Sequence, residues 1–291
     1  MKRRIICAFQ FFNELDILKL KLEELDSVVD YFILSESNKT HSNKPKPLHF
    51  ENNKVLFKKF KSKIIHQVLL DTPNDYVNLK NDSAKDDRYN HVIDVVNGHK
   101  HYPKNQVSYG NDSYEKESLY QAMIFARPDD IVVLGDCDEI PKASALKEVV
   151  DNFDGKEIYH MWHDMFYYYV NLRKNENWFG NMVMTYKTFK ENSFCEMRQF
   201  KQGIFVDNAG WHFTYMGGRD AVRNKIESFG EQSLNLDWVK NGLENSINNA
   251  IERGRDLYNR PCKFWIENIS YDTHPKYLVE HQDQFGEYIR K

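Results

Sequence analysis

The sequence feature that most constrains the fold is a run of four apolar residues that ends in an acidic turn. Residues 131–134 are Ile-Val-Val-Leu, and Gly135-Asp136-Cys137-Asp138-Glu139 follows directly. A run of this composition is typical of a parallel strand that is buried on both faces, and ligands of parallel sheets bind where the strands end. The run therefore predicts an α/β protein with the acidic turn at the ligand-binding edge of its sheet.

The first 70 residues alternate between strand and helix patterns. Residues 5–12 form an apolar run of strand length, and the next segment carries leucines at helical spacing up to Leu25. Residues 28–34 and a segment within 63–70 predict two more strands. This alternation predicts a mainly parallel central sheet with helices on both faces.

The remainder of the chain continues this pattern, with one interruption. We expect helices over 114–126 and 142–152, strands at 157–162, 182–186 and 210–215, and a helical C-terminal region over 219–291 with helices at 219–229 and 236–253. Residues 71–114 are polar, with few periodic apolar positions, and we interpret them as an insertion or lid. We expect a single domain over 1–291.

Composition narrows the class of protein further. With 41% hydrophobic residues among 291, the chain can bury a sizeable core. A formal net charge of -3 predicts neither a nucleic acid nor an anionic membrane as partner. The four cysteines are scattered, and no stretch has the pattern of a signal peptide or a transmembrane segment, so we expect a cytoplasmic protein.

The acidic turn offers two carboxylates one residue apart, Asp136 and Asp138. Carboxylates so spaced can converge on one hard divalent cation, which predicts Mn²⁺ or Mg²⁺. Such a cation would bind the diphosphate of a nucleotide sugar and neutralise the charge of the departing nucleotide. The spacing alone also describes a solvated acidic turn, but the buried strand before it favours the metal site.

Several segments around this turn resemble glycosyltransferase family 17, in the same order from about Ile5 to Phe229. They are Phe12-Asn13-Glu14-Leu15-Asp16, Glu36-Ser37-Asn38, Lys44-Pro45-Lys46-Pro47-Leu48, Asp136-Cys137-Asp138-Glu139-Ile140-Pro141 and Gly210-Trp211-His212-Phe213. The resemblance implies a single Rossmann-like domain of the GT-A type and an inverting transfer from a UDP-sugar to a hydroxyl of a glycan or glycoconjugate. It suggests N-acetylglucosamine, with xylose or another sugar as the alternative. The Golgi membrane anchor typical of the family is absent, which we interpret as a cytoplasmic, microbial or viral version.

Candidates for the chemistry follow from that resemblance. GT-A enzymes often add a histidine from a late strand to the acidic pair, which makes His212 a third metal ligand or else a histidine of the core. Inverting transfer needs a carboxylate to take the proton of the acceptor hydroxyl. We expect Asp164, which follows a predicted strand, in that role; the other possibilities are Glu196, Asp207 and Asp220, or a purely structural role for Asp164.

Candidates for nucleotide binding lie at the ends of the first two strands. Asn13 and Glu14 would contact the uridine, although Asn13 could equally cap the following helix. Glu36 is a similar candidate. Lys44 and Lys46 would approach the diphosphate, unless their loop is simply solvated.

Other functions remain open on the sequence. A nucleotidyltransferase or a sugar-nucleotide phosphohydrolase would also bind a nucleotide through a metal, but no glycine-rich phosphate loop is visible. A non-catalytic, glycan-binding protein related to transferases is the alternative outside enzymes, and the presence of both Asp136 and Asp138 argues against it.

Overall fold

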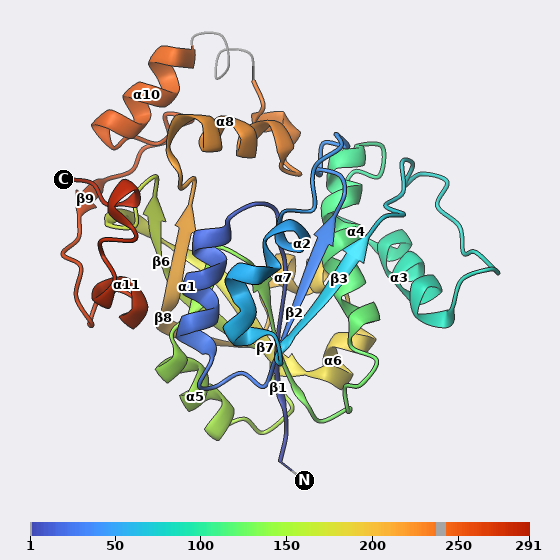
Figure 1. Cartoon of the computed structure of the whole chain (residues 1–291). Coiled ribbons are helices and arrows are strands. Elements are labelled where there is room, and N and C mark those ends of the chain that lie inside the picture. The colour runs from blue at the N-terminus through green and yellow to red at the C-terminus, as the bar shows by residue number, and fades with distance from the viewer. Residues whose placement is uncertain (1, 237–242) are drawn as a thin grey trace.

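A nine-stranded sheet forms the centre of the computed structural model, which describes residues 2–236 and 243–291 (Figure 1). The strand order is β3-β2-β1-β4-β7-β6-β8-β5, and β9 pairs with β7. The strands are β1 (Ile5–Gln10), β2 (Tyr31–Ser37), β3 (Ile64–Leu69), β4 (Ile131–Asp136), β5 (Glu139–Pro141), β6 (Tyr159–Tyr167), β7 (Leu172–Thr185), β8 (Ile204–Thr214) and β9 (Phe264–Ile266). Because only β7 and β5 run against the other strands, the prediction of a mainly parallel sheet is confirmed.

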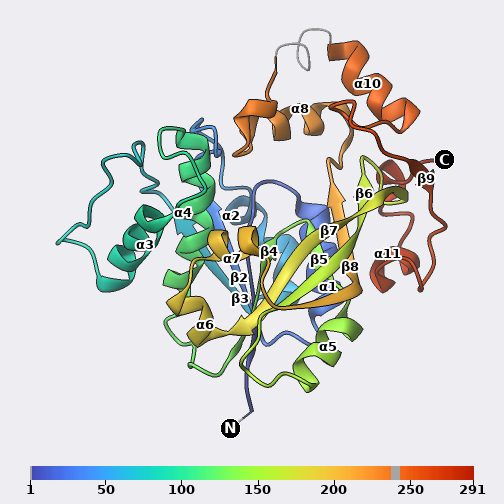
Figure 2. The ribbon, with the colours of Figure 1, turned by 180° about the vertical axis from the view of Figure 1, so that it is seen from behind.

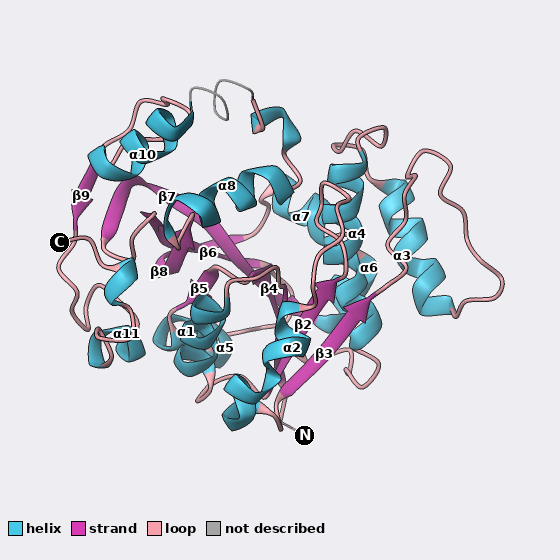
Figure 3. Ribbon diagram, turned by 45° about the horizontal axis from the view of Figure 1, so that its top comes forward, coloured by secondary structure: helices cyan, strands magenta, loops and turns pink. Residues whose placement is uncertain are grey.

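Helices cover both faces of this sheet, as predicted (Figures 2 and 3). The α-helices before β8 are α1 (Leu15–Leu25), α2 (His49–Asn53), α3 (Asp87–Gly98), α4 (Val107–Ala122), α5 (Ala143–Asp151), α6 (Tyr186–Glu191) and α7 (Phe194–Phe200), and the 3₁₀ helix η1 is Lys54–Phe60. Side chains alternate along β1: Cys7 and Phe9 pack with α1 and α5, whereas Ile6 and Ala8 pack with α3 and α4. The two largest hydrophobic clusters therefore lie on opposite faces of the sheet, as the alternation of side chains along a strand requires.

The C-terminal part covers one end of the sheet and continues down its side, where α11 (Lys276–Glu280) packs against α1. It contains α8 (Gly218–Ser228), η2 (Gln232–Leu234), α10 (Leu243–Arg253), α11 and η3 (Gly286–Tyr288). Helices α8 and α10 sit above the end toward which the arrows of β2 and β6 point, opposite the N-terminus (Figure 1). Of the helix predicted over 236–253, residues 237–242 lie outside the described residues.

Several element boundaries differ from the predictions. The second strand begins at Tyr31 and runs on to Ser37, because its polar end still pairs with β3. The strand predicted at 157–162 continues to Tyr167, because it pairs with both β7 and β8 over that length. Within the polar segment 71–114 the structure contains α3 and the first half of α4, and Val92, Ile93 and Val96 of α3 are buried.

Within the described ranges, no helix combines the length and the apolar character needed to cross a membrane.

Candidate functional site

A cavity of about 470 Å³ opens at the carboxyl ends of the central strands, beneath α8. Side chains from β1, β4, α4, α7, β8 and α8 line it, together with the loops after β1 and β2. Its charged and amide side chains are Gln10, Asn13, Glu14, Lys39, His41, Lys46, Asp112, Glu115, Lys116, Asp136, Asp138, Arg198, His212, Lys225, Glu231 and Arg260. The acidic turn therefore lies at the ligand-binding edge that the sequence predicts.

A buried lysine binds the backbone of the acidic turn. Lys21 of α1 is fully buried, and its Nζ donates to the carbonyls of Asp136 at 2.8 Å and Glu139 at 2.7 Å. The Glu139 carboxylate in turn accepts from the backbone N–H of Asp136 at 2.9 Å. These bonds leave the side chains of Asp136 and Asp138 free to face the cavity.

Glu139 is an internal support and not part of the lining. Its buried carboxylate pairs with Arg198 and accepts a hydrogen bond from Trp178 Nε1 at 2.5 Å. Burial alone would raise the pKa of Glu139, but the Arg198 guanidinium outweighs it and lowers that pKa to about 2. The ion pair fixes Arg198 and Trp178, both of which line the cavity.

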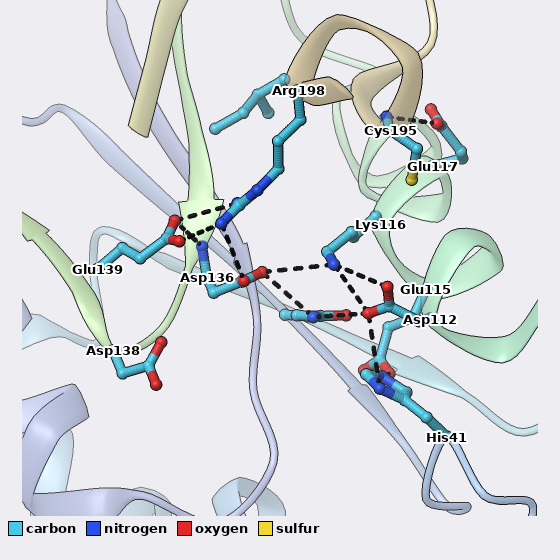
Figure 4. A network of polar contacts seen from close by, with 12 residues as sticks. His41, Asp112, Glu115, Lys116, Glu117, Asp136, Asp138, Glu139, Cys195 and Arg198 are labelled. Atoms are coloured by element: carbon cyan, nitrogen blue, oxygen red, sulfur yellow. Dashed lines mark hydrogen bonds and ion pairs between the residues drawn. The ribbon is translucent and has the colours of Figure 1, made fainter. Parts of the chain in front are cut away.

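Asp136 faces α4 and α7 (Figure 4). Its carboxylate accepts from Gln10 Nε2 at 3.2 Å and lies 3.5 Å from Arg198 and 3.9 Å from Lys116. Lys116 Nζ binds Asp112 more closely, at 2.8 Å. Burial disfavours the charged form of both groups, but the opposite charges around each of them have the larger effect. They lower the pKa of Asp112 and raise the pKa of Lys116.

Asp138 lies apart from this network, with no dashed contact to it (Figure 4), and its partners come from β8 and α8. Lys225 Nζ lies 2.7 Å from its Oδ2, and His212 Nε2 lies 3.5 Å from the same atom. Burial alone would raise the pKa of Asp138, but Lys225 and His212 hold it well below its ordinary value. The carboxylate is therefore fully ionised at neutral pH.

The chemistry of these donors fits a hard divalent cation. Two ligands of one ion with bonds of about 2.1 Å lie about 3 Å apart at right angles, close to the 3.5 Å between Asp138 Oδ2 and His212 Nε2. His212 also has a buried Nδ1 without a hydrogen-bond partner among the described residues. Asp138 and His212 would hold such an ion directly, and Asp136 would complete the set by turning from its present partners or through water.

A second group with ligand geometry, His99, Glu117 and Cys195, lies outside the cavity and does not fit a metal. Glu117 Oε1 already accepts from His99, from Ser193 Oγ at 2.6 Å and from the backbone N–H of Cys195 at 3.0 Å. These bonds fix the start of α7 against α4, which is a structural role.

Six of the predicted residues line the cavity, namely Asn13, Glu14, Lys46, Asp136, Asp138 and His212. The capping role considered for Asn13 is wrong, because Glu14 is the N-cap residue of α1, and its side chain makes no capping bond. Burial and the nearby Asp138 raise the pKa of Glu14.

Two of the predicted nucleotide contacts lie elsewhere. Glu36 is fully buried and accepts from the backbone N–H groups of Phe50 at 2.8 Å and Glu51 at 3.3 Å, so it caps α2. Lys44 is exposed and lies 3.8 Å from Glu227, whereas Lys46, two residues on, lines the cavity.

The structure does not bring the predicted catalytic carboxylates to the cavity. Asp164 lies inside β6, so its side chain faces away from the cavity that Met165 lines, and it pairs with Arg173. Glu196 bonds to the backbone N–H of Lys100 at 3.0 Å, outside the lining. Asp207 and Asp220 are exposed on β8 and α8.

The sequence prediction missed the cations that face the two aspartates, Lys116, Arg198 and Lys225, and the buried Lys21. One signal in the sequence was the run of charged residues at 115–117 in the helix predicted over 114–126, and the structure shows that most residues of this helix, α4, are buried. Buried charges are retained where they are paired or bind a ligand. The other three come from separate elements, and only the tertiary fold brings them together.

The fold and the site together define an α/β protein with a charged ligand cavity built around an acidic turn. The first 95 residues match the model of glycosyltransferase family 17. The chain is 27% identical to the beta-1,4-mannosyl-glycoprotein 4-beta-N-acetylglucosaminyltransferases of Rattus norvegicus and Mus musculus, over 97% of this chain and 54% of each relative. The human protein of the same name is 29% identical over 48% of this chain and 22% of its own length.

These matches confirm the resemblance to glycosyltransferase family 17 that the motifs indicate. The chain spans about half the length of the rat and mouse relatives (54%).

Proposed function

We propose that this protein is a metal-dependent glycosyltransferase that moves a sugar from a UDP-sugar to a hydroxyl of a glycan or glycoconjugate. The observation that carries the proposal is the cavity in which Asp136, Asp138 and His212 meet Lys116, Arg198 and Lys225. The relatives named as N-acetylglucosaminyltransferases support sugar transfer, and they make N-acetylglucosamine the first donor sugar to test.

The charges of the cavity suit a diphosphate leaving group. Breaking the glycosidic bond leaves negative charge on the nucleotide, which fixed cations in a water-poor site stabilise. Lys116 and Lys225 are held by Asp112 and Asp138, and Arg198 is held by Glu139, so these cations are already oriented. A divalent ion held by Asp138, His212 and Asp136 would supply further Lewis-acid stabilisation of the same charge.

Inverting transfer also requires a carboxylate that accepts the proton of the attacking hydroxyl. Asp112 and Glu115 are occupied by Lys116 and His41. Of the other lining carboxylates outside the acidic turn, Glu14 and Glu231 have no ion-pair partner within 4 Å among the described residues. These two are therefore the carboxylates to test as the base.

Calorimetry with UDP, with and without Mn²⁺, tests the proposal. We expect UDP to bind and Mn²⁺ to strengthen the binding, and a screen of UDP-sugars to reveal metal-dependent hydrolysis of one of them. Binding of glycans that is indifferent to both UDP and metal would contradict a transferase. Cleavage inside the diphosphate, with the sugar still attached to a phosphate, would instead indicate a phosphohydrolase.

A further inference from the structure

One end of the cavity contains a carboxylate oxygen without a hydrogen bond. Glu115 of α4 is 4% exposed, and its Oε2 lies 3.1 Å from His41 Nε2. Its Oε1 is buried and has no hydrogen-bond partner among the described residues. A buried acceptor of this kind is costly to leave unpaired, and more so when it is charged. The unpaired oxygen in the lining points to a ligand that brings a donor.

Glu115 is held in place and cannot simply turn to find another partner. His41, which binds it, also lies 3.5 Å from Asp112 through its Nδ1. The loop that carries His41 is fixed to α4, because Asn111 Nδ2 donates to the His41 carbonyl at 2.9 Å. The orientation of the Glu115 carboxylate is therefore set by the protein before any ligand binds.

A chain of polar contacts connects Glu115 to the acidic turn (Figure 4). It runs from Asp136 through Gln10 and Asp112 to His41 and Glu115, with steps of 3.2, 3.2, 3.5 and 3.1 Å. A nucleotide whose diphosphate lies at the acidic turn would therefore reach Glu115 with its base. The part beside Lys225 is lined by Tyr167, Tyr215 and Tyr258, and its described residues include no buried carboxylate oxygen without a hydrogen bond.

Two other residues of the lining also suit a flat heterocycle that carries carbonyl groups. Phe12 lines the cavity, and Lys46, which interacts electrostatically with Glu115, has its Nζ 5.6 Å from the centre of the Phe12 ring. Among the described residues, the polar contacts of Lys46 Nζ are both long, 3.5 Å to the Phe12 carbonyl and 3.9 Å to Glu36. Its ammonium group therefore still has hydrogen-bonding capacity for a carbonyl oxygen.

We propose that Glu115 Oε1 accepts the imide N–H of a uracil ring and that Lys46 donates to a carbonyl next to it. This inference rests on the proposed function, because it assigns the base of the donor nucleotide. Cytosine presents a bare ring nitrogen at the same position, which a carboxylate repels. The site therefore selects uridine over cytidine nucleotides, by roughly 100-fold, because the cytosine ring would leave the buried acceptor unpaired.

The test is calorimetry of UDP and CDP in the presence of Mn²⁺, on the wild type, Glu115→Gln and the control Glu227→Gln. Glu227 is a carboxylate of α8 outside the lining, so its variant should keep the preference of the wild type. Glu115→Gln should reduce the preference for UDP from roughly 100-fold to less than about fivefold. If the wild type binds UDP and Glu115→Gln keeps the full preference, the inference is overturned while the proposed function stands.

A second measurement on the wild type does not depend on the folding of a variant. UDP methylated at the imide nitrogen lacks the donor and should bind about 100-fold more weakly than UDP. Equal binding of the two compounds would overturn the role of Glu115. A wild type that binds no uridine nucleotide with or without Mn²⁺ would overturn the proposed function itself.

Discussion

Asp136 and Asp138 are one residue apart in the sequence but lie in different surroundings. The Asp136 side chain is 26% exposed, and its nearest cationic groups lie at 3.5 and 3.9 Å. The Asp138 side chain is 10% exposed and has Lys225 at 2.7 Å and His212 at 3.5 Å. The two sides of one turn therefore differ: Asp138 meets a histidine and a lysine from β8 and α8, whereas Asp136 faces two more distant cations from α4 and α7. On the proposed function, the Asp138 side would hold the metal.

The connections of the turn explain this difference. Asp136 is the last residue of β4, where it pairs with Gln10 of β1, and it therefore faces the parallel part of the sheet. The chain then enters β5, which pairs antiparallel with β8, and the carbonyl of Asp138 accepts from the N–H of Phe213 at 3.0 Å. The turn therefore spans the two parts of the sheet, with one aspartate on each.

The largest difference between the two sides of the turn should appear when the Asp136 and Asp138 carboxylates are removed separately. Asp138→Asn should weaken Mn²⁺-dependent UDP binding and turnover by about 1,000-fold, since it would lose the proposed metal ligand. Asp136→Asn should cost only about tenfold, because Arg198 and Lys116 keep their other carboxylate partners. The exposed Asp207→Asn serves as the control, and equal losses in both turn variants would contradict the division of roles.

The two parts of the sheet also differ in how well the sequence predicts them. The periodicity of residues 5–37 and 131–136 predicts the parallel part of the sheet and places Asn13, Glu14, Asp136 and Asp138 at its edge. The other part depends on contacts between distant segments: β6 and β7 form a long antiparallel pair, and β8 returns beside β6. Asp164 was misplaced because nothing local indicates that its strand continues for three more residues.

A second test compares stability in acid, because the ion pair of Glu139 and Arg198 lies on the Asp136 side of the turn. The pKa of Glu139 is lowered from 4.5 to about 2. The ionised carboxylate therefore contributes its full share to the free energy of unfolding above about pH 4.5, and this contribution is lost as the pH falls toward 2. Glu139→Gln leaves Arg198 buried without this partner, which should cost about 3 kcal/mol of unfolding free energy at pH 7.

Denaturant titrations of the wild type and Glu139→Gln at pH 7, 4 and 3 measure this loss. The difference between the two proteins should shrink toward low pH, where the wild-type carboxylate becomes protonated. A difference that stays constant over this range would show that the stabilisation by Glu139 does not depend on its charge.

The loop after β2 allows a smaller and more local test, with two lysines that differ in placement. Lys46→Ala removes a cation from the cavity lining and should weaken UDP binding about tenfold. Lys44→Ala removes an exposed lysine 3.8 Å from Glu227 and should change binding less than about twofold. Calorimetry at two salt concentrations would check both, and a reversed order would mean that this loop changes conformation when the nucleotide binds.

The smallest effect is expected at Asp164, although an inverting enzyme requires a catalytic carboxylate. Its side chain lies outside the cavity and pairs with Arg173, so Asp164→Asn should leave turnover within about twofold and lower stability by about 1 kcal/mol. Arg173→Met, which breaks the same pair from the other partner, should show the same combination. Should Asp164→Asn instead lose turnover by 100-fold or more while Arg173→Met stays active, with both variants folded, the base would lie on β6. Acceptor binding would then have to rearrange that strand, because Asp164 and Met165 point to opposite faces of it.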